Sequence, residues 1–203
     1  QIIYSMFYTT LYAVFTITLF DISIERWRRY NSKIQKLSCT DELTGLLNRR
    51  GVKQVVDFQM QQAQILHRET SLIMVDIDNF KKINDQYGHY QGDLVLRHVA
   101  DILKQNLRAN DVIARYGGEE FVVLLPFTSI ENAVALAEGC RKALQQSSIA
   151  VNETERLYVQ ACFGVSSTAR MDFDYMKLFG QADKALYQAK HNGKNQVRTF
   201  SIS

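Results

Sequence analysis

Four carboxylates in two short stretches of the chain are the residues best suited to chemistry. Asp76 and Asp78 lie at the end of an apolar run, and Glu119 and Glu120 follow a pair of glycines. Mg²⁺ prefers hard oxygen ligands and is usually held by one or two carboxylates together with substrate phosphates. The two acidic centres therefore predict a Mg²⁺ site. The alternative is a set of solvated acids at a strand end and at a hairpin tip.

Basic and polar side chains near the first acidic centre are suited to a nucleotide. Lys81 and Lys82 could meet phosphate charge. Asn84 and Asp93 could read a base, because a carboxylate accepts two hydrogen bonds from the N1–H and N2–H₂ edge of guanine. Taken singly, Asp93 is also typical of a helix N-cap and Asn84 of a turn.

A β-hairpin must present the second acidic centre. Residues 112–116 and 121–125 have the composition of its two strands, and Gly117 and Gly118 suit the positive-φ positions of a two-residue turn. Because strand side chains alternate, the two glutamates that follow are expected to start on opposite faces. Adjacent acids at a bare turn repel each other, so a positive group is expected nearby.

Helical and strand patterns alternate after residue 40, which predicts an α/β (α+β) fold with helices around a central mixed, mostly antiparallel sheet. Residues 71–77 are almost continuously apolar, which indicates a buried central strand. Helices are predicted over residues 41–49, 52–66, 93–107, 131–145 and 175–190, and further strands over residues 158–165 and 196–200.

Length and composition limit the function classes. A chain of 203 residues has room for one good core plus an appendage. The net charge of +3 is too small to indicate a nucleic-acid partner. Cys39, Cys140 and Cys162 lack metal-ligand spacing and favour free thiols in a reducing compartment.

An uncharged stretch opens the chain. Residues 2–20 carry no charge, and at about 1.5 Å per residue a helix of this length approaches the thickness of a bilayer core. Basic residues follow between positions 26 and 36, which places the downstream side in the cytoplasm. Residues 1–20 are therefore predicted to be the last transmembrane helix of a longer protein. A buried helix or strand of an upstream soluble domain is the alternative.

Residues 21–38 are predicted to be a helical signalling linker that leads into a domain over residues 39–203. Trp27, Tyr30, Ile34 and Leu37 follow each other at spacings typical of a coiled-coil seam. Such a seam could pair two copies of the chain, or the same stripe could dock on the chain's own domain.

Four ordered motifs together resemble the GGDEF family, the diguanylate cyclases. They read DELTGLLNRRG (41–51), VDIDNFKKINDQYGHYQGD (75–93), RANDVIARYGGEEF (108–121) and ADKALYQAKHNGKNQV (182–197). The resemblance covers roughly residues 38–200. It implies a five-stranded sheet wrapped by helices, similar to the palm of nucleotidyl cyclases and polymerases.

The resemblance also implies a metal and catalytic site. Asp76 and Glu119 would bind Mg²⁺, or Mn²⁺ in its place, with help from the backbone carbonyl of Ile77. Glu120 would complete the acidic site, either as a base on a 3′-hydroxyl or as a group that tunes the metals.

Substrate contacts follow from the same motifs. The resemblance implies that Asn84 and Asp93 hold guanine. The other implied substrate-binding residues are Phe80, Lys81, Lys190 and Lys194, with the three lysines on the triphosphate. Lys194 stands where many relatives have Arg, so a point charge replaces a bidentate fork. Cys162 stands where Ser is common, which we interpret as a packing change.

The implied activity joins two GTP molecules into cyclic di-GMP and releases two pyrophosphates. Each domain holds one GTP, so a homodimer with two-fold symmetry is expected, with the linker controlling its alignment. Arg108 and Asp111 form an RxxD pair that implies inhibition by product; by themselves they fit a surface salt bridge. The implied location is the inner membrane of a bacterium, with the catalytic domain in the cytoplasm.

Other functions stay open at this level. A catalytically silent domain could sense cyclic di-GMP or GTP, although every matched acid is present here. A different dinucleotide product is disfavoured by Asp93. An α/β domain with acids that are merely on its surface is the third alternative.

Overall fold

The computed structural model describes residues 15–20, 22–27, 38–168 and 173–200, and it divides the chain into two units, residues 1–38 and 39–203. In the first unit, residues 15–20 and 22–27 are helical. Most of the predicted transmembrane helix and three of the four seam residues lie outside the described residues. Within the described part, no helix is both long and apolar enough to cross a membrane.

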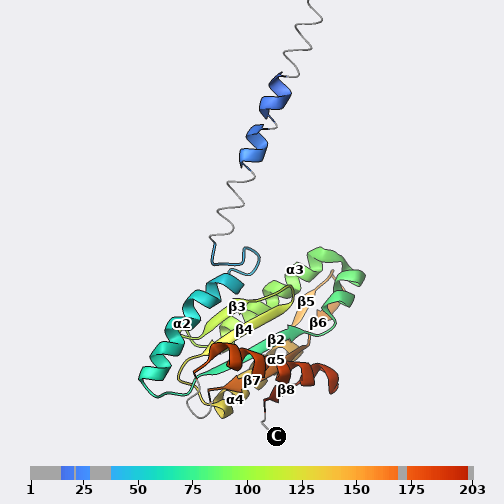
Figure 1. The fold of residues 1–203 in the computed structure, drawn as a ribbon. Coiled ribbons are helices and arrows are strands. Elements are labelled where there is room, and N and C mark those ends of the chain that lie inside the picture. Colours follow the sequence, from blue (N-terminus) through green and yellow to red (C-terminus); the bar gives the residue numbers. More distant parts are fainter. Residues whose placement is uncertain (1–14, 21, 28–37, 169–172, 201–203) are drawn as a thin grey trace, which may run out of the picture. The chain divides into compact units, whose positions relative to one another are not determined.

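The second unit is built on a mixed sheet with the strand order β1-β3-β4-β2-β7-β8 (Figure 1). The four strands β3, β4, β2 and β7 pair antiparallel, while β1 and β8 join the two edges in parallel. The strands are β1 (Leu47–Asn48), β2 (Ser71–Ile77), β3 (Val112–Arg115), β4 (Glu120–Leu125), β7 (Ala161–Ser167) and β8 (Val197–Thr199). A separate hairpin pairs β5 (Ser148–Ala150) with β6 (Arg156–Tyr158). This six-stranded sheet has one more strand than the resemblance implied.

Four helices cover the two faces of the sheet. Helices α3 (Phe80–Asn106) and α4 (Ile130–Gln146) enclose one core, and α2 (Arg49–Ile65) and α5 (Tyr175–His191) enclose the other. In Figure 1, α5 crosses the sheet over β2 and β7, the strands on which it packs.

The central strand β2 is buried along its whole length, as the apolar run predicted. Ile73, Val75 and Ile77 belong to the core under α3 and α4, while Leu72 and Met74 belong to the core under α2 and α5. Alternation then puts the next even-numbered residue of the strand, Asp76, on the α5 face. The register of the sheet is what aims this carboxylate.

Three predicted elements need correction. Residues 41–46 form turns rather than a helix, and α2 begins at Arg49, where the side chain of Asn48 caps it. Helix α3 begins at Phe80 instead of residue 93 and bends at Gly88, whose φ of 81° is not helical. The strand predicted over 158–165 is two strands, β6 and β7. The predictions for β2, α2, α4, α5 and the hairpin strands are confirmed within a few residues.

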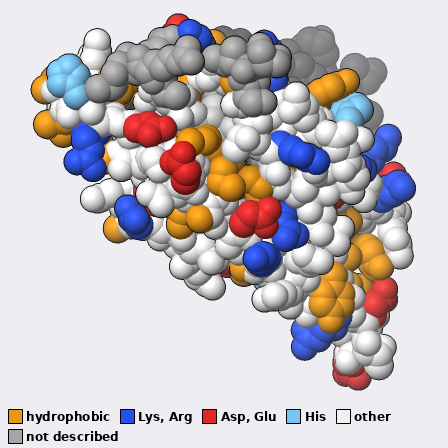
Figure 2. Space-filling model, turned by 90° about the horizontal axis from the view of Figure 1, so that it is seen from below, with side chains coloured by type: hydrophobic (Ala, Val, Ile, Leu, Met, Phe, Trp, Pro, Cys, Tyr) orange, Lys and Arg blue, Asp and Glu red, His pale blue; other side chains and the backbone are white. Residues whose placement is uncertain are grey.

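Polar and apolar side chains are interspersed on the face seen in Figure 2. Acidic and basic groups lie side by side there, so the described residues of that face do not gather the net charge of +3 into one basic field. Electrostatic arguments about that face therefore concern local clusters.

A close approach of backbones fixes how α5 lies on the sheet. Gly164 of β7 faces the backbone of α5, and a Cβ atom at this position would overlap Ala182 and Leu186. Lys190 follows Leu186 by one helical turn. The absence of a side chain at Gly164 thus sets the distance at which Lys190 reaches the sheet.

We expect Gly164→Ala to lower the free energy of unfolding by about 1–3 kcal/mol, because the added methyl group forces α5 away from β7. Urea unfolding followed by circular dichroism measures the change. Gly180→Ala is the matched control: it lies in α5 with open space around its Cβ position, and it should be neutral or stabilising by up to about 1 kcal/mol. Equal stability of parent and Gly164→Ala would contradict the packing argument.

Candidate active site

A half-buried ion pair lies at the end of β2. The Nζ atom of Lys190 is 2.7 Å from Oδ2 of Asp76, whose side chain is only 6% exposed. Lys190 was expected near phosphate, and the sequence reasoning did not foresee that it would meet this carboxylate. It is the positive group that the adjacent acids require.

Two further carboxylates act on this pair. Burial raises the pKa of Asp76 to about 6; the hydrogen bond and charge of Lys190 oppose the rise, while Glu119 and Glu120 add to it. Burial lowers the pKa of Lys190, but Asp76 and the two glutamates outweigh burial, so the net shift is upward. The predicted residues Asp76, Glu119, Glu120 and Lys190 are thus brought into one electrostatic cluster.

The loop between β3 and β4 presents the two glutamates. The N–H groups of Tyr116 and Gly117 both donate to the carbonyl of Glu120, at 2.8 and 3.3 Å, so three residues close the hairpin. Neither Gly117 nor Gly118 has a positive φ, and the predicted two-residue turn is wrong. Gly117 is needed for another reason, because a Cβ there would press on the Glu120 carboxylate.

The two glutamates differ in how the backbone holds them. Glu120 opens β4 opposite Asp76, and it shares the α5 face with Val122 and Leu124, which pack in that core. Glu119 lies in the loop, where strand alternation does not set its direction. Its carbonyl accepts the N–H of Ile77 at 3.3 Å, which ties the loop to the end of β2.

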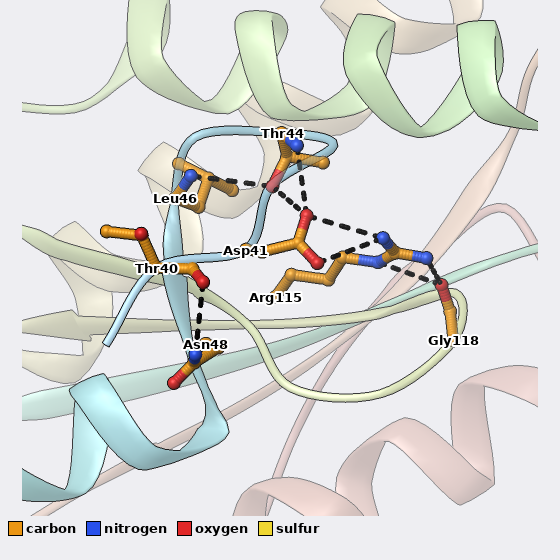
Figure 3. A network of polar contacts seen from close by, with 7 residues as sticks. All are labelled: Thr40, Asp41, Thr44, Leu46, Asn48, Arg115 and Gly118. Carbon is orange, nitrogen blue, oxygen red and sulfur yellow. Dashed lines mark hydrogen bonds and ion pairs between the residues drawn. The ribbon is translucent and has the colours of Figure 1, made fainter. Parts of the chain in front are cut away.

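An arginine fixes the same loop from the other side (Figure 3). The Arg115 guanidinium donates from Nε and Nη2 to the carbonyl of Gly118, at 3.1 and 2.7 Å. Its Nη1 atom lies 3.1 Å from Oδ2 of Asp41, and Thr44 donates to Asp41 from both its backbone N–H and its hydroxyl. Asp41 therefore joins the turn that begins the domain to the loop between β3 and β4, a link that sequence reasoning missed.

The residues proposed for guanine lie before and after the bend of α3 at Gly88. The Asn84 side chain rests against Gly92, so closely that a Cβ there would collide with its Oδ1, and the ring of Phe80 adjoins the same position. Asp93, next to Gly92, is exposed. Both polar residues lie inside α3, so neither the N-cap nor the turn interpretation holds.

The remaining basic candidates differ in their contacts. Lys81 is exposed at the start of α3. Lys194 donates from Nζ to Oδ1 of Asn79 at 2.7 Å, which brings it beside the residue that precedes α3. Lys190 and Lys194 thus approach the end of β2 from the last turn of α5 and the loop that follows.

Cys162 does more than fill space. It is fully buried opposite Asp76 in the sheet, and its thiol donates to Oδ1 of Asp78 at 3.0 Å. The packing interpretation is therefore incomplete. The cysteines among the described residues are free, as predicted.

Comparison with known proteins identifies the family of this domain. The family description "Diguanylate cyclase, GGDEF domain" matches residues 38–196. The chain belongs to the GGDEF family. It is similar to the response regulator PleD of Caulobacter vibrioides, with 43% identity over 163 residues, which cover 80% of this chain and 36% of PleD. The described fold is accordingly a GGDEF domain that spans about a third of that relative.

Two solved structures share the fold. One is the active GGEEF domain of a diguanylate cyclase from Vibrio cholerae, with a TM-score of 0.74 and 35% identity, covering 78% of this chain and 99% of that one. The other is the GGDEF domain of DgcB from Caulobacter crescentus in complex with c-di-GMP, with a TM-score of 0.76 and 30% identity, covering 81% and 94%. The mixed α/β architecture around a mostly antiparallel sheet is confirmed.

The RxxD pair of this GGDEF domain is a turn held through its backbone. The Arg108 N–H donates to Oδ2 of Asp111 at 2.8 Å, and the Asp111 N–H donates to the Arg108 carbonyl. The described ion pairs do not include these two side chains, so the surface salt bridge is wrong. Both residues line a cavity of about 990 Å³ that also touches α2 and the loop after β4.

The cavity of about 990 Å³ does not coincide with the acidic cluster. A second one, of about 720 Å³, is lined by Arg49, Tyr116 and Tyr175 among others. Neither cavity is lined by Asp76, Glu119 or Glu120. We place the candidate site at the acidic cluster because charge and donor chemistry select it there.

The acidic cluster has the donor chemistry of a divalent cation site. Its three carboxylates are hard oxygen donors, and the pairing with Lys190 leaves an excess of negative charge. Over the described residues, no three His, Cys, Asp or Glu side chains form a ready cage. This fits Mg²⁺, which usually takes one or two carboxylates and completes its shell with water and substrate phosphates.

The Asp41 link generates a test. Burial raises the pKa of Asp41, but its bonds to Thr44 and Arg115 outweigh burial and hold the pKa below 3.8. The stabilisation from Asp41 is therefore present above pH 3.8 and is lost as pH falls through the lower folded-state value. Asp41→Asn should lower the free energy of unfolding by about 1–3 kcal/mol at neutral pH and flatten the acid limb of its pH dependence.

The neighbouring exposed Glu42 provides the control, since Glu42→Gln should leave the unfolding free energy within about 0.5 kcal/mol of the parent. Chemical denaturation at a series of pH values measures both variants. An acid limb as steep in Asp41→Asn as in the parent would exclude this role.

Proposed function

We propose that this GGDEF domain condenses two GTP molecules into cyclic di-GMP with release of two pyrophosphates. The observation that carries the proposal is the cluster of Asp76, Glu119 and Glu120 around a single lysine at the end of β2. A triphosphate brings further negative charge. This acidic cluster could accept it only together with a bound cation. The relatives named as diguanylate cyclases support the same activity.

Asp76 and Glu119, with the carbonyl of Ile77, would hold Mg²⁺, for which Mn²⁺ is a possible replacement. When bound, the cation would neutralise phosphate charge and lower the pKa of the attacking hydroxyl. The ammonium group of Lys190 lies beside Asp76. It would therefore be close to a triphosphate bound there and could contact its oxygens. Lys81 and Lys194 would add positive charge around the same phosphates.

Asn84 and Asp93 would select guanine, with Phe80 beneath them. Asp93 is exposed and available for the N1–H and N2–H₂ edge of the base. Asn84 is fixed against Gly92, which makes its amide a preformed partner for the base. This pair would account for a preference for GTP.

The reaction forms two bonds, each between the 3′-oxygen of one GTP and the α-phosphorus of the other, and one pyrophosphate leaves as each bond forms. The hydroxyl proton passes to Glu120 or to solvent. Each domain binds one GTP, so two domains must face each other with two-fold symmetry. The protein contributes positioning and charge neutralisation, which dominate catalysis of phosphoryl transfer.

Product would also act as an inhibitor at Arg108 and Asp111. The side chain of Arg108 is not used in the turn, because the turn engages its backbone N–H and carbonyl. A planar guanidinium suits guanine and phosphate acceptors. The adjoining cavity of about 990 Å³ gives room for a ligand.

We extend the proposal to the first unit of the chain. Residues 1–20 would end a membrane anchor in the inner membrane of a bacterium, and residues 21–38 would pair two copies and set their alignment. The uncharged stretch and the basic residues after it support this location.

With GTP and Mg²⁺, Glu119→Gln should reduce formation of cyclic di-GMP by about a hundredfold or more, because a ligand of the cation is lost. Mass spectrometry of the products measures the rate. Exposed Glu153 supplies the control, and Glu153→Gln should keep the parental rate. A parent that binds GTP and forms no product would instead indicate a silent sensing module.

Arg108→Ala should weaken inhibition by cyclic di-GMP by about tenfold or more, the loss expected when charge-assisted hydrogen bonds are removed. Initial rates at increasing product concentrations give the inhibition constant. Arg97→Ala, at an exposed position on α3, is the control and should be inhibited by cyclic di-GMP as strongly as the parent. Identical constants for Arg108→Ala and the parent would refute the inhibitory site.

A further inference from the structure

Asp78 is a buried acid for which the proposed reaction has no use. It is 6% exposed, two residues after Asp76. Oδ1 accepts the thiol of Cys162 at 3.0 Å, and Oδ2 accepts the backbone N–H of Asn195 at 2.8 Å. Both oxygens are acceptors, which suits a carboxylate.

The hydrogen bond between Asp78 and the N–H of Asn195 holds a turn whose backbone has positive φ angles. Gly193, Lys194 and Asn195 have φ values of 104°, 61° and 43°. Left-handed conformations of this kind suit glycine and are tolerated by asparagine, but they are unfavourable for lysine and persist there because the surroundings impose them. Asp78 supplies such a restraint from outside the turn.

The other restraints on the turn come from different directions. The Lys194 N–H donates to Ala189 of α5, and Arg141 of α4 donates to the Asn195 side chain. The bond from Asp78 ties the turn to the strand that carries Asp76. The next residue, Asn79, accepts a hydrogen bond from the Lys194 ammonium group at 2.7 Å. Asp78 and Asn79 thus bind both the backbone and a side chain of the turn.

We propose that Asp78 is a positioning residue that fixes the turn at residues 193–195, so that Lys194 meets the outer phosphates of a bound nucleoside triphosphate. The inference rests on the proposed function. Lysine presents a point charge on a flexible stem, so its placement depends on the backbone beneath it. The Cys162 thiol donates to the other carboxylate oxygen of Asp78 and so helps to orient this side chain.

Electrostatics and positioning predict opposite results at this residue. Removing a negative charge near the phosphates would, by charge alone, strengthen the binding of an anionic ligand. Loss of a positioning residue weakens it. The exposed Asp85 on α3 reports the effect of charge alone.

The test measures Mg²⁺-dependent binding of 3′-deoxy-GTP, which lacks the reacting hydroxyl, and of GMP, which lacks the outer phosphates, by calorimetry on the 203-residue chain. Asp78→Ala should weaken the binding of 3′-deoxy-GTP about tenfold, as expected for loss of a charge-assisted hydrogen bond. It should change the affinity for GMP less than about twofold. Asp78→Asn keeps one acceptor and should show an intermediate loss, which carries the test if the alanine variant does not fold. Asp85→Ala should bind 3′-deoxy-GTP as tightly as the parent or more tightly.

A double-mutant cycle with Lys194 separates positioning from general damage. Asp78→Ala combined with Lys194→Ala should bind 3′-deoxy-GTP no more weakly than Lys194→Ala alone. Three results would each overturn the inference. They are losses of affinity from the two substitutions that multiply in the double variant, equal losses of affinity for GMP and 3′-deoxy-GTP, and tighter binding of 3′-deoxy-GTP by Asp78→Ala. A parent chain that binds neither nucleotide would overturn the proposed function and this inference with it.

Discussion

The domain depends on holding three carboxylates around one ammonium group. Asp76 is removed from water, and Glu119 and Glu120 lie near enough to raise its pKa further, while Lys190 is the cation that offsets them. Such an arrangement stays unbalanced, because one positive charge faces several acids. Under the proposed function, this site would gain from binding a cation, and the cation would in turn admit an anionic nucleotide. The rest of the fold can be understood as the means of keeping these groups together.

Three contacts in different parts of the fold maintain the cluster. Gly164 lets the backbone of α5 approach β7, which brings Lys190 down to the sheet. Arg115 holds the carbonyl of Gly118 and thereby the loop that carries the glutamates. Asp78 ties the turn after α5 to the end of β2. The geometry of the cluster is therefore specified by packing and hydrogen bonds before any ligand arrives.

Local patterns in the sequence predicted much of this structure. The run 71–77 is β2 itself, because a continuous apolar stretch can only be buried on both faces, and the GGEEF motif does lie in a hairpin. Long-range contacts explain the failures. Residues 41–46 are held as a turn because Asp41 meets Arg115, 74 positions away, which no helical propensity can reveal. The role of Asp78 depends on Asn195, 117 positions away. Lys190 was predicted near phosphate by resemblance, and its pairing with Asp76 needed the register of α5 on the sheet.

A crystal structure of the chain with 3′-deoxy-GTP and Mg²⁺ tests the central claim most directly. The account predicts that Asp76 and Glu119 bind the metal ion while the ammonium group of Lys190 leaves Asp76 for a phosphate oxygen. A nucleotide bound elsewhere, with Lys190 still paired to Asp76 and no ion between the acids and the phosphates, would contradict it.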